Sequence, residues 1–169
     1  MRKIILFIAS SLDGYIAREN GDIDWLPETG SSGYDDFIKS VDTVVMGKKT
    51  YDQVLTFGDY PYNDKKSYVL TRSKNSSKDE NTEFVQDAEK LIKNTLSDSG
   101  KNIWLIGGSE IISTFVNLDL IDELVLSLIP VVLGKGIPLF KNMEKELKMK
   151  LLKTTDYENL VELHYKILK

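Results

Sequence analysis

The feature that most constrains the fold is an apolar run that ends in two glycines, Gly107 and Gly108. The run at residues 103–106 reads Ile-Trp-Leu-Ile, and a helix-forming pattern follows at residues 109–115. Glycine lets the chain turn sharply and lets a ligand approach the main chain closely. The start of the next helix offers free N–H groups and a positive dipole end. The pattern predicts a buried strand, a turn and a helix, and the turn is either a plain tight connection or an anion site.

Two further apolar runs, residues 44–46 and 67–70, also end beside groups that bind anions. The groups at and after these ends are Gly47, Lys48, Lys49 and Thr50 in the first case, and Leu70, Thr71, Arg72 and Ser73 in the second. Lysine and arginine supply positive charge, and a guanidinium can hold a phosphate through two bonds. Because ligands of open α/β sheets bind outside the carboxyl ends of the strands, the three ends are expected to share one extended phosphorylated ligand. A dinucleotide is the natural candidate.

Strand and helix patterns alternate along most of the chain. The expected strands are residues 2–9, 42–46, 67–71, 83–85 and 103–106, and the expected helices are 33–40, 48–55, 87–96 and 109–115. From residue 121 the sequence pattern changes to long β-type runs at 123–132, 147–155 and 160–168. This order predicts an α/β fold whose largely parallel sheet finishes with an antiparallel hairpin. No linker interrupts the chain, so residues 1–169 are expected to form a single domain.

Composition excludes several classes of function. The chain has no cysteine and a single histidine, His164, so thiolate chemistry and histidine-rich metal sites are excluded. No metal is expected, although carboxylates alone could still form a magnesium or calcium site. A net charge of −4 argues against nucleic-acid binding, which needs a basic surface. The apolar run at residues 2–9 is too short to cross a membrane, and no segment approaches the roughly 20 apolar residues required. A cytoplasmic protein without a membrane partner is the simplest expectation.

Four segments in order, residues 11–17, 46–51, 70–73 and 106–109, make the chain resemble the dihydrofolate reductase-like superfamily. Segments 120–124 and 130–140 look most like the pyrimidine reductase domain of riboflavin biosynthesis. The resemblance covers essentially the whole chain. It implies a three-layer α/β/α fold with a central mixed, mostly parallel sheet. Related reductase domains also pair through the apolar run at residues 124–133, so the resemblance implies a homodimer.

The resemblance further implies NADPH as the hydride donor. The cofactor-binding residues would be Ala9, Ile16 and Ala17 beside the nicotinamide, Gly47, Lys48, Lys49, Thr50, Leu70, Thr71, Arg72 and Ser73 around the adenosine half and its 2′-phosphate, and Ile106, Gly107, Gly108, Ser109, Glu110 and Ile111 around the pyrophosphate. The protein would position the substrate and exclude water, because the hydride chemistry belongs to the cofactor.

The substrate half matches the superfamily less well. Asp36 and Asp35 are the candidate catalytic acids, although two aspartates at this point can equally favour the start of a helix. Asp13, Trp25 and Phe37 are the candidate substrate contacts, and Trp25 would either stack on a substrate ring or anchor the long loop at residues 10–32. The arginine-rich helix typical of the riboflavin enzyme is absent, since residues 32–40 contain only Lys39.

The sequence therefore predicts an NADPH-dependent oxidoreductase that transfers hydride to a small heterocyclic or carbonyl substrate. The most similar activity is that of 5-amino-6-(5-phosphoribosylamino)uracil reductase. Two alternatives stay open: dihydrofolate reduction, and an NADPH-binding or sensing protein without catalysis, because a fold does not settle a function.

Overall fold

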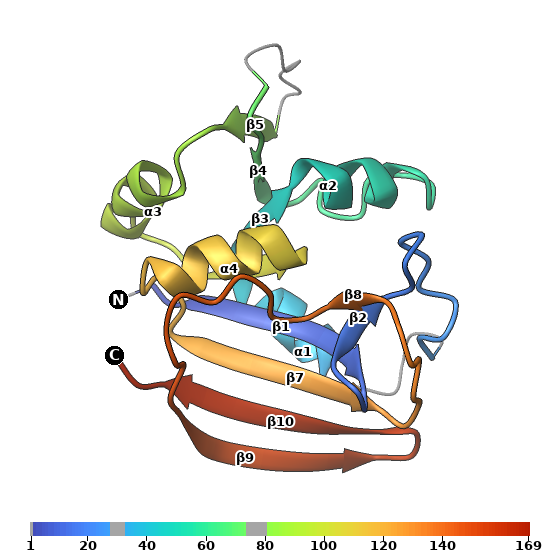
Figure 1. The fold of residues 1–169 in the computed structure, drawn as a ribbon. Helices are drawn as coiled ribbons and strands as arrows, with labels where there is room; N and C mark the ends of the chain where they lie inside the picture. The colour runs from blue at the N-terminus through green and yellow to red at the C-terminus, as the bar shows by residue number, and fades with distance from the viewer. Residues whose placement is uncertain (1, 28–32, 74–80) are drawn as a thin grey trace.

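The computed structural model describes residues 2–27, 33–73 and 81–169. The strands are β1 (Ile4–Ser11), β2 (Tyr15–Ala17), β3 (Val41–Gly47), β4 (Lys66–Leu70), β5 (Thr82–Val85), β6 (Asn102–Gly107), β7 (Glu123–Ile129), β8 (Ile137–Pro138), β9 (Met149–Tyr157) and β10 (Leu160–Ile167). The helices are α1 (Tyr34–Lys39), α2 (Lys48–Leu55), α3 (Ala88–Ser97) and α4 (Ser109–Asn117). An eight-stranded sheet runs in the order β5-β4-β3-β6-β1-β7-β10-β9, and β2 pairs with β8 separately (Figure 1).

Every pairing from β5 across to β7 is parallel, and β10 is antiparallel to both β7 and β9. The central strands are apolar on both faces, as a sheet covered on both sides requires, and Val44 and Val45 on β3 are fully buried. One face packs against α3 and α4 around Ile112 and Phe115, and the other packs against α1 and α2 around Tyr51 (Figure 1). The predicted three-layer fold, with its mixed sheet and C-terminal hairpin, is confirmed.

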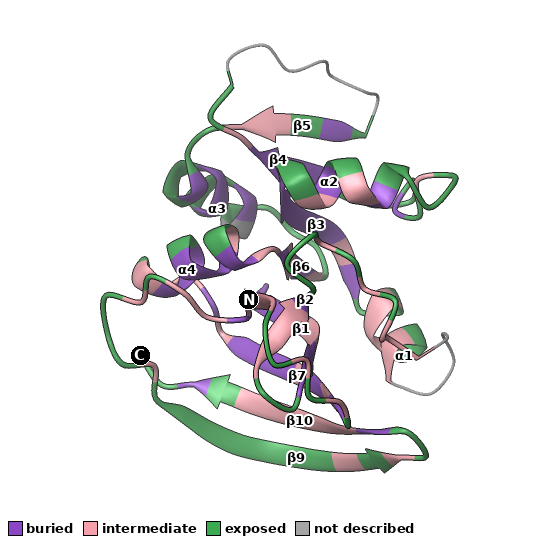
Figure 2. Ribbon diagram, turned by 45° about the vertical axis from the view of Figure 1, so that its right-hand side comes forward, coloured by how far each residue is buried: buried purple, intermediate pink, exposed green. Residues whose placement is uncertain are grey.

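The expected β-type run at residues 123–132 forms a shorter strand that is not an edge of the sheet. β7 ends at Ile129 and lies between β1 and β10, so both of its sides are paired. The edge strands are β5 and β9, and none of the residues of β9 is buried (Figure 2). The long loop after β1 also contains β2, a short strand that the sequence did not reveal. No helix in the described part of the chain is long and apolar enough to cross a membrane.

The short β2 and β8 strands hold the chain after β1 against the chain after β7. The Leu12 N–H donates to the Val131 carbonyl at 2.8 Å, and the Leu139 N–H donates to the Gly14 carbonyl at 2.8 Å. A side chain at Gly136 would collide with the Ala17 carbonyl, so this approach of two backbones requires glycine. The small sheet thereby fixes the segment that leaves the carboxyl end of β1.

Candidate functional site

The carboxyl ends of β3 and β6 meet at glycines. Met46 pairs with Gly107 across the ladder, and a Cβ at Gly47 would lie only 2.9 Å from Cγ1 of Ile111. Gly107 has a φ of +115°, and its peptide bond to Gly108 is cis. These glycines therefore allow the first turn of α4 to pack directly onto the end of β3.

The first turns of α2 and α4 lie side by side at this end of the sheet. A Cβ at Gly108 would lie 3.6 Å from the Thr50 hydroxyl, in ordinary contact. Gly47 and Gly108 are the N-cap residues of α2 and α4, and neither has a side chain that could cap the first N–H groups. Two neighbouring helix starts without side-chain caps are suited to binding phosphate.

Positive charge from two other elements reaches the same place. Lys49 on α2 and Arg72 after β4 are both exposed. The pKa of Glu110 on α4 is lowered, chiefly by its hydrogen bond from Lys141 at 3.3 Å and then by the charges of Lys141, Lys49 and Arg72. Because the charges of Lys49 and Arg72 both contribute to the lowered Glu110 pKa, both cations lie near the first turn of α4. Lys48, by contrast, is paired with Asp52 along the surface of α2.

The other predicted cofactor contacts near these strand ends differ in whether their side chains can reach a ligand. The Thr71 N–H donates to the Val85 carbonyl at 2.9 Å, and the Ser73 N–H donates to the Thr71 hydroxyl at 3.1 Å, so the turn that carries Arg72 is held in place. The Leu70 side chain is buried in the core. The buried Ser109 hydroxyl donates to the Pro138 carbonyl and is thus directed into the protein. Leu70 and Ser109 can therefore contribute only main-chain groups.

The chain after β2 bounds the site on the side of β1. Ala9 and Ile16 are half-buried, and Ala17 is buried in the β2–β8 pair. Beyond β2 the loop reaches α2, where the Gln53 amide donates to the Gly21 carbonyl at 2.8 Å. This bond links the segment after β1 to the helix after β3. The predicted nicotinamide and adenosine regions are thereby bridged by one direct contact.

Asp35 and Asp36 do not point into the protein. Both are exposed, and the Asp36 side chain is 97% exposed, with Oδ1 3.8 Å from the Lys39 Nζ. The buried side of α1 instead carries Tyr34 and other apolar residues at helical spacing. Neither side chain faces the core, and their role as catalytic acids stays a prediction. Both aspartates lie in the first turn of α1, where negative charge favours the helix.

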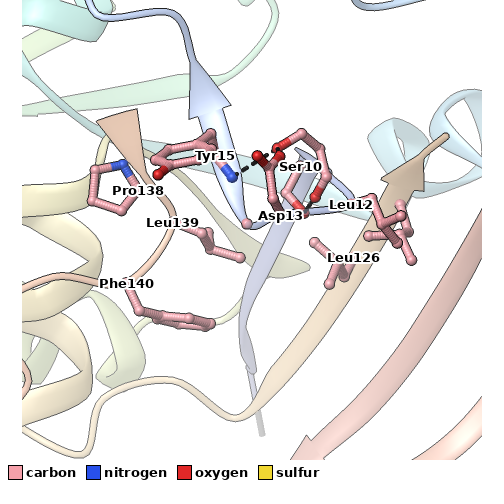
Figure 3. A pocket seen from close by; sticks show the side chains of 11 residues that line it. Ser10, Leu12, Asp13, Tyr15, Leu126, Pro138, Leu139 and Phe140 are labelled. Carbon is pink, nitrogen blue, oxygen red and sulfur yellow. Dashed lines mark hydrogen bonds between the residues drawn. The ribbon is translucent and has the colours of Figure 1, made fainter. Parts of the chain in front are cut away.

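Asp13 has an intramolecular role. Its carboxylate accepts hydrogen bonds from the Ser11 hydroxyl at 2.7 Å, the Leu133 N–H at 3.1 Å and the Gly134 N–H at 2.8 Å. The Ser11 bond is the main cause of a lowered Asp13 pKa. Asp13 borders a cavity of about 450 Å³ whose lining includes Leu126, on the face of the sheet opposite α1 (Figure 3). It holds the loop after β7, and its role as a substrate contact stays a prediction.

The two aromatic candidates differ in their surroundings. Phe37 stacks on Phe7 with ring centroids 4.4 Å apart and meets Trp104 edge-on at 5.5 Å, so it belongs to the core between α1 and the sheet. This packing argues against Phe37 as a substrate contact. Trp25 is half-buried, and its indole Nε1 is buried without a hydrogen-bond partner in the described part of the chain. An unpaired indole N–H remains available for a ligand.

Sequence reasoning missed two further polar groups. The Ser127 hydroxyl and the Glu162 Oε2 are buried, and neither has a hydrogen-bond partner among the described residues. Each interrupts a strand that is otherwise largely apolar, Ser127 in β7 and Glu162 near the start of β10. A polar residue inside such a run is the signal that could have revealed them. No cluster of three or more potential metal ligands occurs within the described ranges.

Similar known proteins indicate the family of the chain. YwjB of Bacillus subtilis (strain 168), an uncharacterized protein, is 44% identical to this chain, and the match covers 97% of each chain. A structure from Shewanella sp. PV-4, assigned to riboflavin biosynthesis, is 31% identical over 100% of both chains with a TM-score of 0.87.

Two more distant structures establish the fold. A deaminase and 5-amino-6-(5-phosphoribosylamino)uracil reductase from Thermotoga maritima is 18% identical, with a TM-score of 0.77 over 99% of this chain and 57% of that one. Dihydrofolate reductase from Enterococcus faecalis, complexed with NADP(H), is 15% identical, with a TM-score of 0.71 over 99% of this chain and 97% of that one. The model of the RibD C-terminal domain matches residues 2–163. With its dihydrofolate reductase-like fold, the chain belongs to the RibD C-terminal domain family of reductases.

Proposed function

We propose that this protein is an NADPH-dependent reductase of a small heterocyclic substrate, of the type that acts on 5-amino-6-(5-phosphoribosylamino)uracil. The observation that carries the proposal is the convergence of Lys49 and Arg72 on Glu110 beside two glycine-capped helix starts. Main-chain N–H groups suit a pyrophosphate, and the two cations suit a further phosphate monoester. NADPH carries both groups, whereas NADH lacks the second.

NADPH, when bound, supplies a hydride from C4 of its nicotinamide. The chain's own residues would bind and orient the cofactor. The helix starts at Gly47 and Gly108 would hold the pyrophosphate, and Arg72 with Lys49 would hold the 2′-phosphate. The loop that Gln53 ties to α2 would limit access of water to the nicotinamide side.

The cofactor preference gives a direct test. We expect Arg72→Ala to weaken NADPH binding roughly 10-fold or more, because a charge-assisted phosphate contact contributes about 1.5–3 kcal/mol. NADH binding should stay unchanged. Titrations of each nucleotide followed by tryptophan fluorescence measure both constants. Lys90→Ala, an exposed cation on α3, is the control. An unchanged ratio of NADPH to NADH affinity in Arg72→Ala would refute the assignment of the 2′-phosphate.

Dihydrofolate reduction and NADPH binding without catalysis are the two alternative functions. Dihydrofolate reduction depended on an acid at Asp35 or Asp36, and both are exposed. A binding protein without catalysis stays open, because a fold does not settle a function. Tight NADPH binding with no loss of nicotinamide absorbance in the presence of pyrimidine, pterin or aldehyde substrates would favour that second alternative.

A further inference from the structure

Ala9, Ser127 and Glu162 lie in one row across the sheet. The ladder pairs Ala9 on β1 with Ser127 on β7, and Ser127 with Glu162 on β10. Directly paired residues present their side chains on the same face of a sheet. Phe7, two residues before Ala9, stacks on Phe37 of α1, so the row lies on the α1 face. The polar pair is therefore beside Ala9, which borders the proposed nicotinamide position.

The polar atoms of this row are buried and unsatisfied. Ser127 is 4% exposed, and neither its hydroxyl nor the Glu162 Oε2 has a hydrogen-bond partner in the described segments. A Cβ placed on Gly33, the N-cap of α1, would lie 3.1 Å from the Glu162 Oε1 and 3.1 Å from the Tyr157 hydroxyl. The carboxylate thus lies between the sheet and the start of α1. Buried polar groups without partners cost free energy, and such groups at a binding site are satisfied by a ligand.

We propose that Glu162 and Ser127 are substrate-binding residues, and that the substrate presents adjacent N–H donors to the Glu162 carboxylate. This inference rests on the proposed function and narrows its substrate class. An ionised carboxylate only accepts hydrogen bonds, so it selects amino and ring N–H groups. The 5-amino and 6-amino positions of a 5,6-diaminouracil ring offer two such donors side by side. The Ser127 hydroxyl can donate to a ring carbonyl.

The same charge orients the rest of the substrate. A phosphate directed toward Glu162 would meet a carboxylate whose Oε2 is buried without a hydrogen-bond partner among the described residues, and would be repelled. A phosphoribosyl group must therefore point away from the row while the ring lies over it. Glu162 on β10 would thereby set the orientation of the substrate.

The test is calorimetric titration of the full chain with 5,6-diaminouracil and, in separate cells, with NADPH. We expect Glu162→Gln to weaken 5,6-diaminouracil binding at least about 10-fold, equivalent to roughly 1.4 kcal/mol, because the variant loses the charge and presents an amide donor. NADPH binding should be unchanged. Glu158→Gln, in the exposed turn between β9 and β10, is the matched control and should bind both ligands normally.

1,3-Dimethyluracil, which has neither amino nor ring N–H donors, separates recognition from a structural effect. Its binding should be weak and equal in wild type and Glu162→Gln. Ser127→Ala, a small change that removes only the hydroxyl, covers the case in which Glu162→Gln does not fold, and it should also weaken 5,6-diaminouracil binding. Wild-type failure to bind 5,6-diaminouracil, or equal binding by the variants, would overturn the inference. Failure to bind NADPH would instead overturn the proposed function, and the 5,6-diaminouracil titration would still decide the role of Glu162.

Discussion

Glu123 carries a buried carboxylate at the end of the sheet opposite the candidate site. Its side chain is 11% exposed and accepts hydrogen bonds from Lys3 Nζ at 2.6 Å, while its other oxygen lies 2.9 Å from the His164 Nε2. Burial by itself raises the Glu123 pKa, but the bonds to Lys3 and His164 outweigh it and the net pKa is lowered from 4.5. The ionised form therefore stabilises the folded chain. His164 is part of this structural contact.

Glu123→Gln should destabilise the protein by about 1–3 kcal/mol near neutral pH, because Lys3 and His164 lose a buried charged acceptor. A lowered folded pKa means that this contribution is present above the unfolded pKa of about 4.5 and is lost as pH falls through the folded value. Urea unfolding of both proteins from neutral pH into the acid range measures the gap between their free energies of unfolding. It should shrink with acidification, and Glu146→Gln, at an exposed glutamate, should show no gap. A gap that persists in acid would contradict this account.

Between elements, the loop after β2 is tied to α2 by one side-chain bond. The Gln53 amide donates to the Gly21 carbonyl at 2.8 Å, across 32 residues of sequence. Gly21 has a φ of +92°, a conformation that glycine adopts without strain. The contact orders a loop that would otherwise lose conformational entropy only when the cofactor binds.

Gln53→Ala should therefore weaken NADPH binding several-fold, on the order of the 0.5–1.5 kcal/mol that one hydrogen bond contributes, with little change in melting temperature. Gln53→Glu keeps the size but removes the donor and should behave alike. Asn94→Ala, on the exposed surface of α3, is the control. Fluorescence titration and thermal unfolding provide the two measurements. Equal NADPH affinity in all four proteins would show that the loop is ordered by other contacts.

For the whole molecule, exposed apolar residues gather beside the loop after β7. Leu12 is 62% exposed and Val132 is 65% exposed, and the Leu12 N–H bonds to the carbonyl of Val131. The neighbouring cavity is lined by further apolar side chains, including Leu126 and Phe140 (Figure 3). Adjacent exposed apolar groups mark interaction surfaces. We propose that a second copy of the chain covers this region.

Light scattering at micromolar concentration should give about twice the 19.2 kDa of one chain. Leu12→Glu with Val132→Glu should shift the mass to that of a monomer, because burying two charges in an apolar interface is unfavourable. Phe57→Glu, which replaces an equally exposed aromatic residue after α2, should leave the mass unchanged. A wild-type mass of one chain would rule out the dimer.

Part of the candidate site could be predicted from local sequence pattern. Apolar runs that end at Gly47 and Gly107 predicted strand ends that the structure brings together, because glycine and strand periodicity are local properties. The inner face of α1 was also encoded locally, since its apolar residues repeat at helical spacing. Asp35 and Asp36, the predicted acids, lie off that face. The pairing of Glu162 with Ser127 across 35 positions carried no comparable local signal.

By itself the sequence determined the alternation of strands and helices, the mostly parallel sheet, the glycine turns and the cations near them. Each of these follows from periodicity, backbone freedom or charge within a few neighbouring residues. Only the tertiary structure decided that β9 is an edge strand, that Asp13 holds a loop and that the Glu162 Oε2 is buried on a residue paired with Ser127. Those outcomes depend on strand order and register, which are set by packing between segments far apart in the chain.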